Sequence, residues 1–242
     1  MDMFNLNSLF AASLSNDDYV GFTFFVGSMA MAAATVFFFM ERGSVEGKWK
    51  TSLLVSGLIT FIAAVHYYYM RGYWIDNGTS PTALRYIDWT LTVPLMCVEF
   101  YLILKSFGAK IGLMWKMIFF SVGMLVTGYL GETVFRDSNV IWGIISTLFY
   151  LGIVYEIWFG GAKKLAASSN DPHLQKAFRA LGLFVLIGWG IYPIGYCVLP
   201  GNILHGVLAI ETLDLAYNLG DAINKIGFGL VIYGLAVNSK NS

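Results

Sequence analysis

Five ionisable residues lie inside long apolar stretches of this chain, and their types suit charge pairing and proton transfer. They are Arg85, Asp88, Glu99, Asp221 and Lys225, and Glu211 and Asp214 lie nearer the outer end of the stretch that contains the last two. An Asp, Lys or Arg at the centre of a membrane helix costs roughly 2.5 to 3.5 kcal/mol, so such residues are rare and usually functional. Five of them at helical spacings therefore indicate a functional site in the interior of a helical membrane protein.

The spacing of four of these residues predicts local charge compensation. Arg85 and Asp88 are three residues apart, and Asp221 and Lys225 are four apart, so each pair shares one face of a helix. The formal charges of the four residues sum to zero. We therefore expect each pair to compensate its charge within its own helix.

Glu99 has no oppositely charged neighbour in the sequence. It follows Asp88 by eleven residues, about three turns, which puts it on the same face roughly 16 Å further along the helix. Its neighbours Met96, Val98 and Phe100 are apolar. Because burial favours the protonated form of a carboxyl group, Glu99 is expected to hold a proton ready to donate. The alternative is a carboxyl group whose hydrogen bond is only structural.

The composition excludes several classes of protein. Of the 242 residues, 57% are hydrophobic and 12% charged, against roughly 25% charged residues in soluble domains. The net charge is zero, which gives no basic excess for nucleic acid, and no Cys/His cluster has the spacing of a metal site. Cys97 and Cys197 lie in apolar runs and are interpreted as packing residues.

The elements that must position the ionisable residues are seven apolar runs. A bilayer core roughly 30 Å thick needs about 20 apolar residues in a helix. The runs that meet this length are Tyr19–Met40, Thr51–Met70, Ala83–Leu104, Ile111–Leu130, Asn139–Phe159, Ala180–Leu199 and Gly206–Ala236. The fold class predicted is all-α, a seven-transmembrane-helix bundle, formed as one domain over residues 1–242.

Basic residues indicate how the bundle is oriented in the membrane. Lys and Arg gather in the first, third and fifth loops, whereas the other loops hold only Arg71 and Arg136. By the positive-inside rule the C-terminus, with Lys240, is cytoplasmic and the N-terminus is outside. Residues 1–18 are then an extracellular tail and 237–242 a cytoplasmic tail.

Three segments together resemble one known family. The third span reads Arg85-Tyr-Ile-Asp88-Trp89-Thr-Leu-Thr92-Val-Pro94-Leu-Met96-Cys-Val-Glu99, the sixth contains Gly188-Trp189-Gly-Ile-Tyr192-Pro193, and the seventh reads Leu215-Ala-Tyr-Asn-Leu-Gly-Asp221-Ala-Ile-Asn-Lys225. These residues are similar to those of the proteorhodopsins, microbial (type 1) rhodopsins. The resemblance covers nearly the whole chain and implies that retinal occupies the core of the bundle.

The resemblance assigns a role to each matching position. It implies that Lys225 forms a Schiff base with all-trans retinal, a use of a buried amine that is chemically reasonable because burial favours its neutral, nucleophilic form. Asp88 is similar to the proton acceptor, Asp221 to the second counterion and Glu99 to the proton donor. The remaining matches are Arg85 beneath the counterions, Thr92 in the middle of an Asp-Thr-Glu triplet, and Trp89, Trp189 and Tyr192 as the rings around the polyene. Each ring alone is also an ordinary packing or interfacial residue, and Thr92 alone is typical of a hydroxyl bonded to its own helix.

The Asp-Thr-Glu triplet is typical of outward proton pumps in this family. The resemblance thus implies a light-driven transporter rather than an enzyme, in the cell inner membrane among lipids, and assembled as a pentamer or hexamer. It implies protons as the transported species. A photosensor of the same fold that signals through a partner is the alternative, and a seven-helix receptor or carrier without retinal is a third reading.

Three further expectations concern residues near this set. His66 and Asp88 each lie about six residues in from the extracellular end of the predicted helix, so they should reach similar depth. The resemblance implies that they couple, and a histidine that serves only in packing is the alternative. Met96 occupies the position where green-absorbing relatives carry Leu and blue-absorbing ones Gln, and being apolar it suggests green absorption. Glu132 and Glu156 are interpreted as exposed carboxylates at loop ends.

Overall fold

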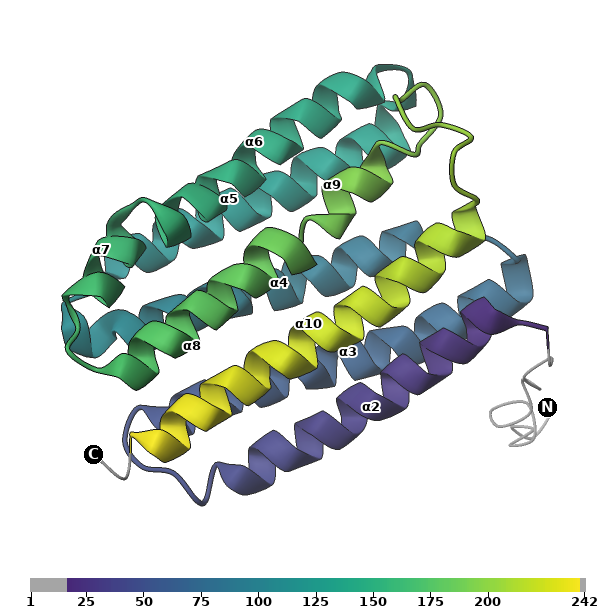
Figure 1. The fold of residues 1–242 in the computed structure, drawn as a ribbon. Helices are drawn as coiled ribbons and strands as arrows, with labels where there is room; N and C mark the ends of the chain where they lie inside the picture. Colours follow the sequence, from purple (N-terminus) through teal and green to yellow (C-terminus); the bar gives the residue numbers. More distant parts are fainter. Residues whose placement is uncertain (1–16, 240–242) are drawn as a thin grey trace, which may run out of the picture.

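The structure is a bundle of helices that run side by side. This computed structural model describes residues 17–239, and in that part of the chain it contains no strand. Seven helical segments there are long and apolar enough to cross a membrane. The first begins and the last ends at opposite ends of the bundle, as an odd number of crossings requires (Figure 1). The predicted all-α seven-helix fold is confirmed, whereas residues 1–16 and 240–242 of the expected tails lie outside the described residues.

Six of the spans are each centred on one long α-helix, and the sixth span is interrupted. The long helices are α2 (Tyr19–Glu41), α3 (Trp49–Asn77), α4 (Thr82–Leu104), α5 (Ile111–Tyr129), α6 (Asn139–Trp158) and α10 (Ile210–Asn238). The sixth span consists of α8 (Pro172–Leu183), a π-helical turn (Phe184–Gly188) and α9 (Ile191–Tyr196). A short helix, α7 (Gly161–Ser168), joins α6 to α8, and the remaining turns are Lys105–Phe107, Leu130–Val134 and Arg136–Ser138.

Two helices extend well beyond the apolar runs that predicted them. Helix α3 continues for seven residues past Met70 and ends where Gly78 turns the backbone with a φ of 63°, a left-handed conformation that glycine adopts readily. At the other end of the bundle, α8 begins eight residues before Ala180. There the Asp171 side chain accepts hydrogen bonds from the first backbone N–H groups of the helix. Hydropathy therefore predicts which residues lie in the apolar layer of the membrane, whereas Gly78 and Asp171 determine where the helices end or begin.

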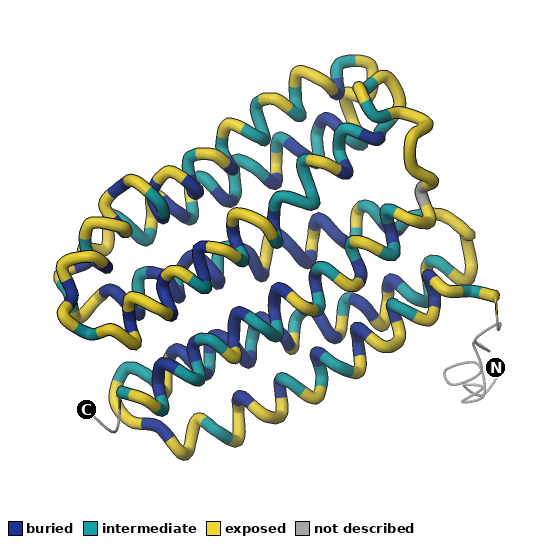
Figure 2. The backbone as a smooth tube through the Cα atoms, viewed as in Figure 1, coloured by how far each residue is buried: buried dark blue, intermediate teal, exposed yellow. Residues whose placement is uncertain are grey.

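The polar interior lies where α3, α4 and α10 face one another. Helices adjacent in the chain pack together, and α10 closes the bundle by packing against α2, α3 and α8. Exposed residues cover the outward faces of the helices and buried ones their inward faces (Figure 2). In the apolar windows, 56% of the residues of α3 and of α4 and 44% of those of the last span are buried, against 22% for the fourth span and 28% for the fifth. Side chains on α3, α4 and α10 are therefore the ones that meet in the core.

Candidate functional site

Lys225 of α10 lies in the core of the bundle with two carboxylates. Its Nζ donates hydrogen bonds to Oδ2 of Asp88 on α4 at 2.5 Å and to Oδ2 of Asp221, one turn earlier on α10, at 2.9 Å. All three side chains are buried. A buried charge is stable only when it is paired and hydrogen-bonded, and this cluster meets that requirement for the amine. Lys225 and Asp221 pair within α10, as their spacing predicts.

The two carboxylates differ in how many donors surround them. Asp221 also accepts hydrogen bonds from the Tyr67 hydroxyl at 2.9 Å, the Trp89 indole at 3.1 Å and the Tyr192 hydroxyl at 2.5 Å. In Asp88, by contrast, Oδ1 is buried and accepts no hydrogen bond within the described part of the chain. Hydrogen bonds donated to a carboxylate stabilise its charged form. Asp221 is therefore held as an anion, whereas Asp88 keeps an oxygen at which a proton can bind.

Arg85 does not compensate Asp88, and this prediction was wrong. Its Nη2 donates to Oδ1 of Asp214 at 2.8 Å and to Oδ1 of Asn218 at 2.7 Å, both on α10. The Ser80 hydroxyl binds the same oxygen of Asp214 at 2.8 Å. The side chain of Arg85 is long enough to reach the next helix, so its position on α4 does not decide its partner.

Asp214 is a member of the buried site that sequence reasoning left at the end of its span. It is 1% exposed and forms an ion pair with Arg85. Asp214, Asn218, Asp221 and Lys225 follow one another at spacings of four, three and four residues, so they share one face of α10. That spacing, read from the sequence, would have predicted that Asp214 belongs to the buried site. With Asp214, the site contains one buried carboxylate more than the four residues whose formal charges sum to zero.

Glu99 lies about three turns further along α4 than Asp88, beside buried serine side chains of α3. It is fully buried, and its Oε1 accepts a hydrogen bond from the Ser56 hydroxyl of α3 at 3.1 Å. Ser52, one turn earlier on α3, is buried as well. No salt bridge within the described residues includes Glu99. The expected isolation from charge is therefore present, and Ser56 is the partner that the sequence did not indicate.

An apolar pocket begins at the rings that bind Asp221. Among its lining residues are Trp89, Trp189 and Tyr192. The same Trp89 and Tyr192 donate to Asp221, which is bonded to Lys225. An aldehyde with a long apolar tail would find here a buried amine and an aromatic-lined pocket beside it. The donor set and the pocket fit retinal.

The break in the sixth span positions two of these rings. Pro193 has no N–H group, so the carbonyl of Trp189 lacks its usual helical donor and binds the N–H of Tyr192 instead, at 3.1 Å. The Tyr150 hydroxyl of α6 lies within hydrogen-bonding distance of two carbonyls of the π-helical turn, at 3.0 Å for Val185 and 2.8 Å for Leu186. Tyr150 is buried and lines the same pocket. Sequence reasoning missed this residue, which had no distinguishing spacing.

His66, Thr92 and Met96 are buried or half-buried near the site without lying in its network. Nδ1 of His66 is 3.8 Å from Oδ1 of Asp88, too long for a hydrogen bond, and is 2.8 Å from the carbonyl of Ile62. The Thr92 hydroxyl donates to the backbone carbonyl of Asp88 at 2.9 Å, the back-bonded arrangement common in membrane helices. Met96 is 1% exposed and is absent from the described lining of the pocket.

His66 lies further from the end of its helix than the sequence predicts. Because α3 continues to Asn77, His66 lies eleven residues from its end rather than six, whereas Asp88 lies six residues into α4. The two residues still meet, because α3 extends further out of the bundle than α4 before the chain turns back. His66 and Asp88 are therefore close, as predicted, although they do not lie at equal distances from the ends of their helices.

Glu132 and Glu156 are not the exposed carboxylates that the sequence suggested. Glu156 is 5% exposed and forms an ion pair with Lys116 at 2.7 Å. Glu132 is half-buried and accepts a hydrogen bond from the Tyr86 hydroxyl at 3.0 Å. Both lie near helix ends, but the neighbouring helix covers them, and a sequence position near a loop does not reveal that cover.

Comparison with known proteins identifies relatives along almost the entire chain. A family model described as bacteriorhodopsin-like protein matches residues 18–239. A green-light absorbing proteorhodopsin of gamma-proteobacterium EBAC31A08 is 44% identical over 95% of this chain and 91% of its own length. A blue-light absorbing proteorhodopsin of gamma-proteobacterium Hot 75m4 is 46% identical over 95% of this chain and 90% of its own.

Solved structures agree with this comparison. The crystal structure of a blue light-absorbing proteorhodopsin from Med12 superposes with a TM-score of 0.78 at 42% identity, over 92% of this chain and all of the other. Xanthorhodopsin, described as a light-driven ion pump with dual chromophore, superposes with a TM-score of 0.79 at 29% identity, over 94% and 96% of the two chains.

Proposed function

The chain belongs to the bacteriorhodopsin-like family, and from that premise we propose that it is a light-driven pump that moves protons outward across a membrane. The observation that carries the proposal is the buried amine of Lys225 between Asp88 and Asp221, with Glu99 on the opposite side. A proton acceptor and a proton donor on opposite sides of one amine are the arrangement that directional transfer needs. The likeness to proteorhodopsins supports it.

Nζ of Lys225 is the position proposed to hold all-trans retinal. Lys225 is the only buried lysine within the part of the chain that the structure describes. Trp89, Trp189 and Tyr192 would enclose the polyene, since all three line the adjacent pocket. When bound, retinal supplies the absorption of visible light and a change of shape that reorients the proton on Nζ. The apolar Met96 supports green absorption.

On the Asp88 side, the proton on Nζ of Lys225 moves to Oδ2 of Asp88, which lies 2.5 Å away. Asp221 does not compete for it, because three aromatic donors and the lysine already stabilise its charged form. Arg85 is held by Asp214 and keeps a fixed positive charge on this side. The proton therefore has one acceptor, and to one oxygen of this acceptor no described residue donates a hydrogen bond.

On the other side, Glu99 returns a proton to Nζ of Lys225. Its apolar surroundings favour the protonated carboxyl group, and Ser56 keeps that group turned towards α3. Asp88 and Glu99 are eleven residues apart on α4, roughly 16 Å along the helix. Protons that leave on one side and arrive from the other cross the membrane in one direction.

The direction proposed is outward from the cell. The positive-inside rule assigns the Lys- and Arg-rich end of the bundle, where Glu99 lies, to the cytoplasm. The N-terminus is then outside and the C-terminus inside, with the chain in the inner membrane and assembled as a pentamer or hexamer. Each proton moved against 100 mV requires roughly 2.3 kcal/mol of electrical work.

The decisive experiment measures the pH of a suspension of cells that express the chain and are given retinal. Illumination should acidify the medium, and a protonophore should abolish the change. Lys225→Ala should form no visible pigment and give no response, because no other described lysine is buried. A visible band that survives in this variant contradicts the assignment of Lys225.

A photosensor of the same fold is the second candidate. A coloured protein that gives no light-dependent acidification in the same cells would favour it. We prefer the pump because a sensor has no need of Glu99 as a buried donor on the far side of Lys225.

A further inference from the structure

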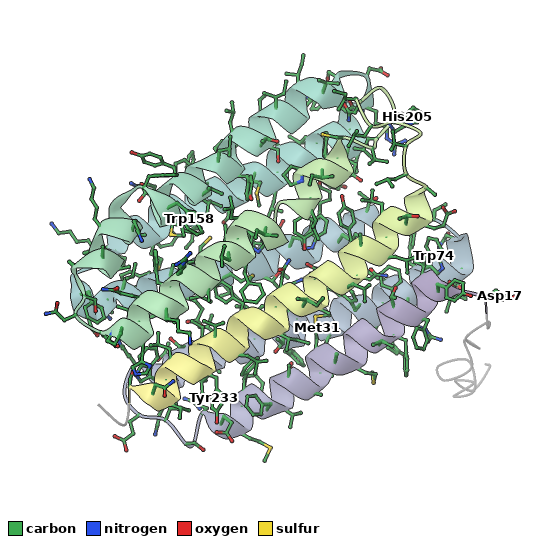
Figure 3. All side chains as sticks on the ribbon, in the orientation of Figure 1. Asp17, Met31, Trp74, Trp158, His205 and Tyr233 are labelled. Carbon is green, nitrogen blue, oxygen red and sulfur yellow. The ribbon has the colours of Figure 1, made fainter. Side chains whose placement is uncertain are left out.

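A recess at the basic end of the bundle has the chemistry of an anion site. It lies where α6 ends and α8 passes beside it, and it contains about 480 Å³ of open space. Its lining residues are Ile157, Trp158, Lys163, Phe178, Arg179 and Gly182. Trp158 lies at the junction of α6 and α7 (Figure 3). None of these residues belongs to the site around Lys225.

The polar groups of this recess are left without partners by the described part of the protein. The Trp158 indole N–H is buried and donates no hydrogen bond there. Lys163 and Arg179 are exposed, and neither forms a salt bridge with a described residue. A buried donor without an acceptor is unfavourable, and it is satisfied when a ligand brings an acceptor oxygen. Two cations beside it select a ligand that is negatively charged.

The walls of the recess are apolar and closely fitted. Ile157 is 1% exposed and Phe178 is 3% exposed. Gly182 has no side chain, and this leaves room for the two neighbouring side chains. A Cβ atom at this position would lie only 3.0 Å from Ile157 and 3.3 Å from the Trp158 ring. Lys and Arg beside an indole at the end of a membrane helix are typical of the interface between lipid tails and water. The ligand thus combines an anionic group with apolar chains.

We propose that this recess binds the phosphate headgroup of an anionic phospholipid from the adjacent leaflet. The Arg179 guanidinium matches the oxygens of a phosphate with two parallel donors, and Lys163 adds a point charge. The Trp158 N–H supplies a third donor. The acyl chains lie along the exposed apolar faces of the neighbouring helices. The proposal concerns the membrane that surrounds the protein and does not depend on its transport function.

Native mass spectrometry of the full chain, released from detergent with added lipid, tests the proposal. Titration with phosphatidylglycerol should reveal one bound lipid with higher affinity than the rest, and phosphatidylcholine should not reproduce it. The double variant Lys163→Gln, Arg179→Gln should bind this lipid about tenfold more weakly, since each basic group near a membrane surface contributes several-fold. Trp158→Phe, which removes only the N–H donor, should weaken binding by a smaller factor.

The matched control is Lys105→Gln with Lys110→Gln, which removes the same charge at the same end of the bundle but outside the recess. Equal loss of affinity in the control and in the recess variant would overturn the proposal, because the attraction would then come from the whole basic surface. Displacement of the lipid by millimolar inorganic phosphate would overturn it as well, by identifying a site for a soluble anion. Loss confined to the recess variants supports the lipid site.

Discussion

The two halves of the core on either side of Lys225 are built differently. The Asp88 half holds two hydrogen-bonded clusters, one of Lys225 with Asp88 and Asp221 and one of Arg85 with Asp214 and Ser80. In the Glu99 half, the Glu99 carboxyl group forms no ion pair with a described residue and accepts a hydrogen bond from the Ser56 hydroxyl. A dense network stabilises fixed charges, whereas an apolar surrounding stabilises a neutral acid. This difference allows protons to leave by one half and return through the other.

The first prediction removes the acceptor from the Asp88 half. Asp88→Asn should abolish light-driven acidification, because the amide cannot take a proton from Nζ of Lys225. It should also shift the absorption to the red, since loss of the negative charge favours the state in which positive charge spreads along the chromophore. Flash spectroscopy and pH recordings on the same sample measure both. Undiminished pumping would assign the acceptor role to Asp221 and reverse the contrast between the two carboxylates.

The second prediction removes the donor from the Glu99 half. Glu99→Gln should leave the colour nearly unchanged and slow the return of the proton to Lys225 by on the order of a hundredfold, which is typical for loss of a general acid. Azide, a small mobile acid, should restore the rate. Ser56→Ala is the milder change, because it removes only the hydrogen bond to Oε1. If the rate in the Gln variant equalled that of the wild type, Glu99 would be a structural residue.

Much of this comparison could be predicted from sequence, because it depends on single helices. The apolar runs reveal the seven spans, and the spacing of Asp221 and Lys225 reveals their shared face. Tyr67 could not be found in this way, because it contacts Asp221 across 154 positions in the chain. Ser56 likewise comes from another helix than Glu99. The spacing of residues along one helix predicts which charged residues are buried. It does not predict which residue of another helix forms a hydrogen bond with each of them.

Arg85 illustrates the limit of that reasoning. Its sequence neighbour Asp88 is nearer along α4, yet the guanidinium bonds to Asp214 and Asn218. A long side chain can bond to residues on any helix within its reach. The arrangement of α4 and α10 in the bundle therefore decides which partners Arg85 has. The predicted end of α3 at Met70 is wrong for a related reason. The helix continues beyond the apolar layer to Asn77, and hydropathy does not detect a polar extension of a helix.

The third prediction concerns Tyr150, which lines the pocket and bonds to the π-helical turn of the sixth span. Tyr150→Phe should destabilise the pigment by about 1 to 3 kcal/mol, because the carbonyls of Val185 and Leu186 lose a buried donor. The rate of thermal loss of the visible band measures the effect. Tyr155→Phe is the matched control, since Tyr155 lies on the same helix and is 58% exposed. Equal bleaching rates in wild type and both variants would show that the hydroxyl does not support the break in the sixth span.

The last and smallest effect is expected at His66, on the edge of the Asp88 half. Its Nδ1 lies 3.8 Å from Oδ1 of Asp88, which accepts no hydrogen bond from residues 17–239, and this distance is short enough for electrostatic coupling without a direct bond. Protonated Asp88 cannot accept the proton of Lys225, so pumping should weaken as the external pH falls through the titration of Asp88. Wild-type absorption should shift with pH as this carboxylate gains its proton.

His66→Asn should move the midpoint of that colour change by about one pH unit or less, the size expected from an interaction worth about 1 kcal/mol. Asn keeps a polar side chain but cannot be protonated, so the variant separates charge coupling from packing. His205→Asn is the control, because this histidine lies in the loop before α10 and binds the carbonyl of Val198. Coincident midpoints for wild type and His66→Asn would show that Asp88 titrates independently. The Asp88 half would then owe its properties to Lys225, Arg85 and the aromatic donors alone.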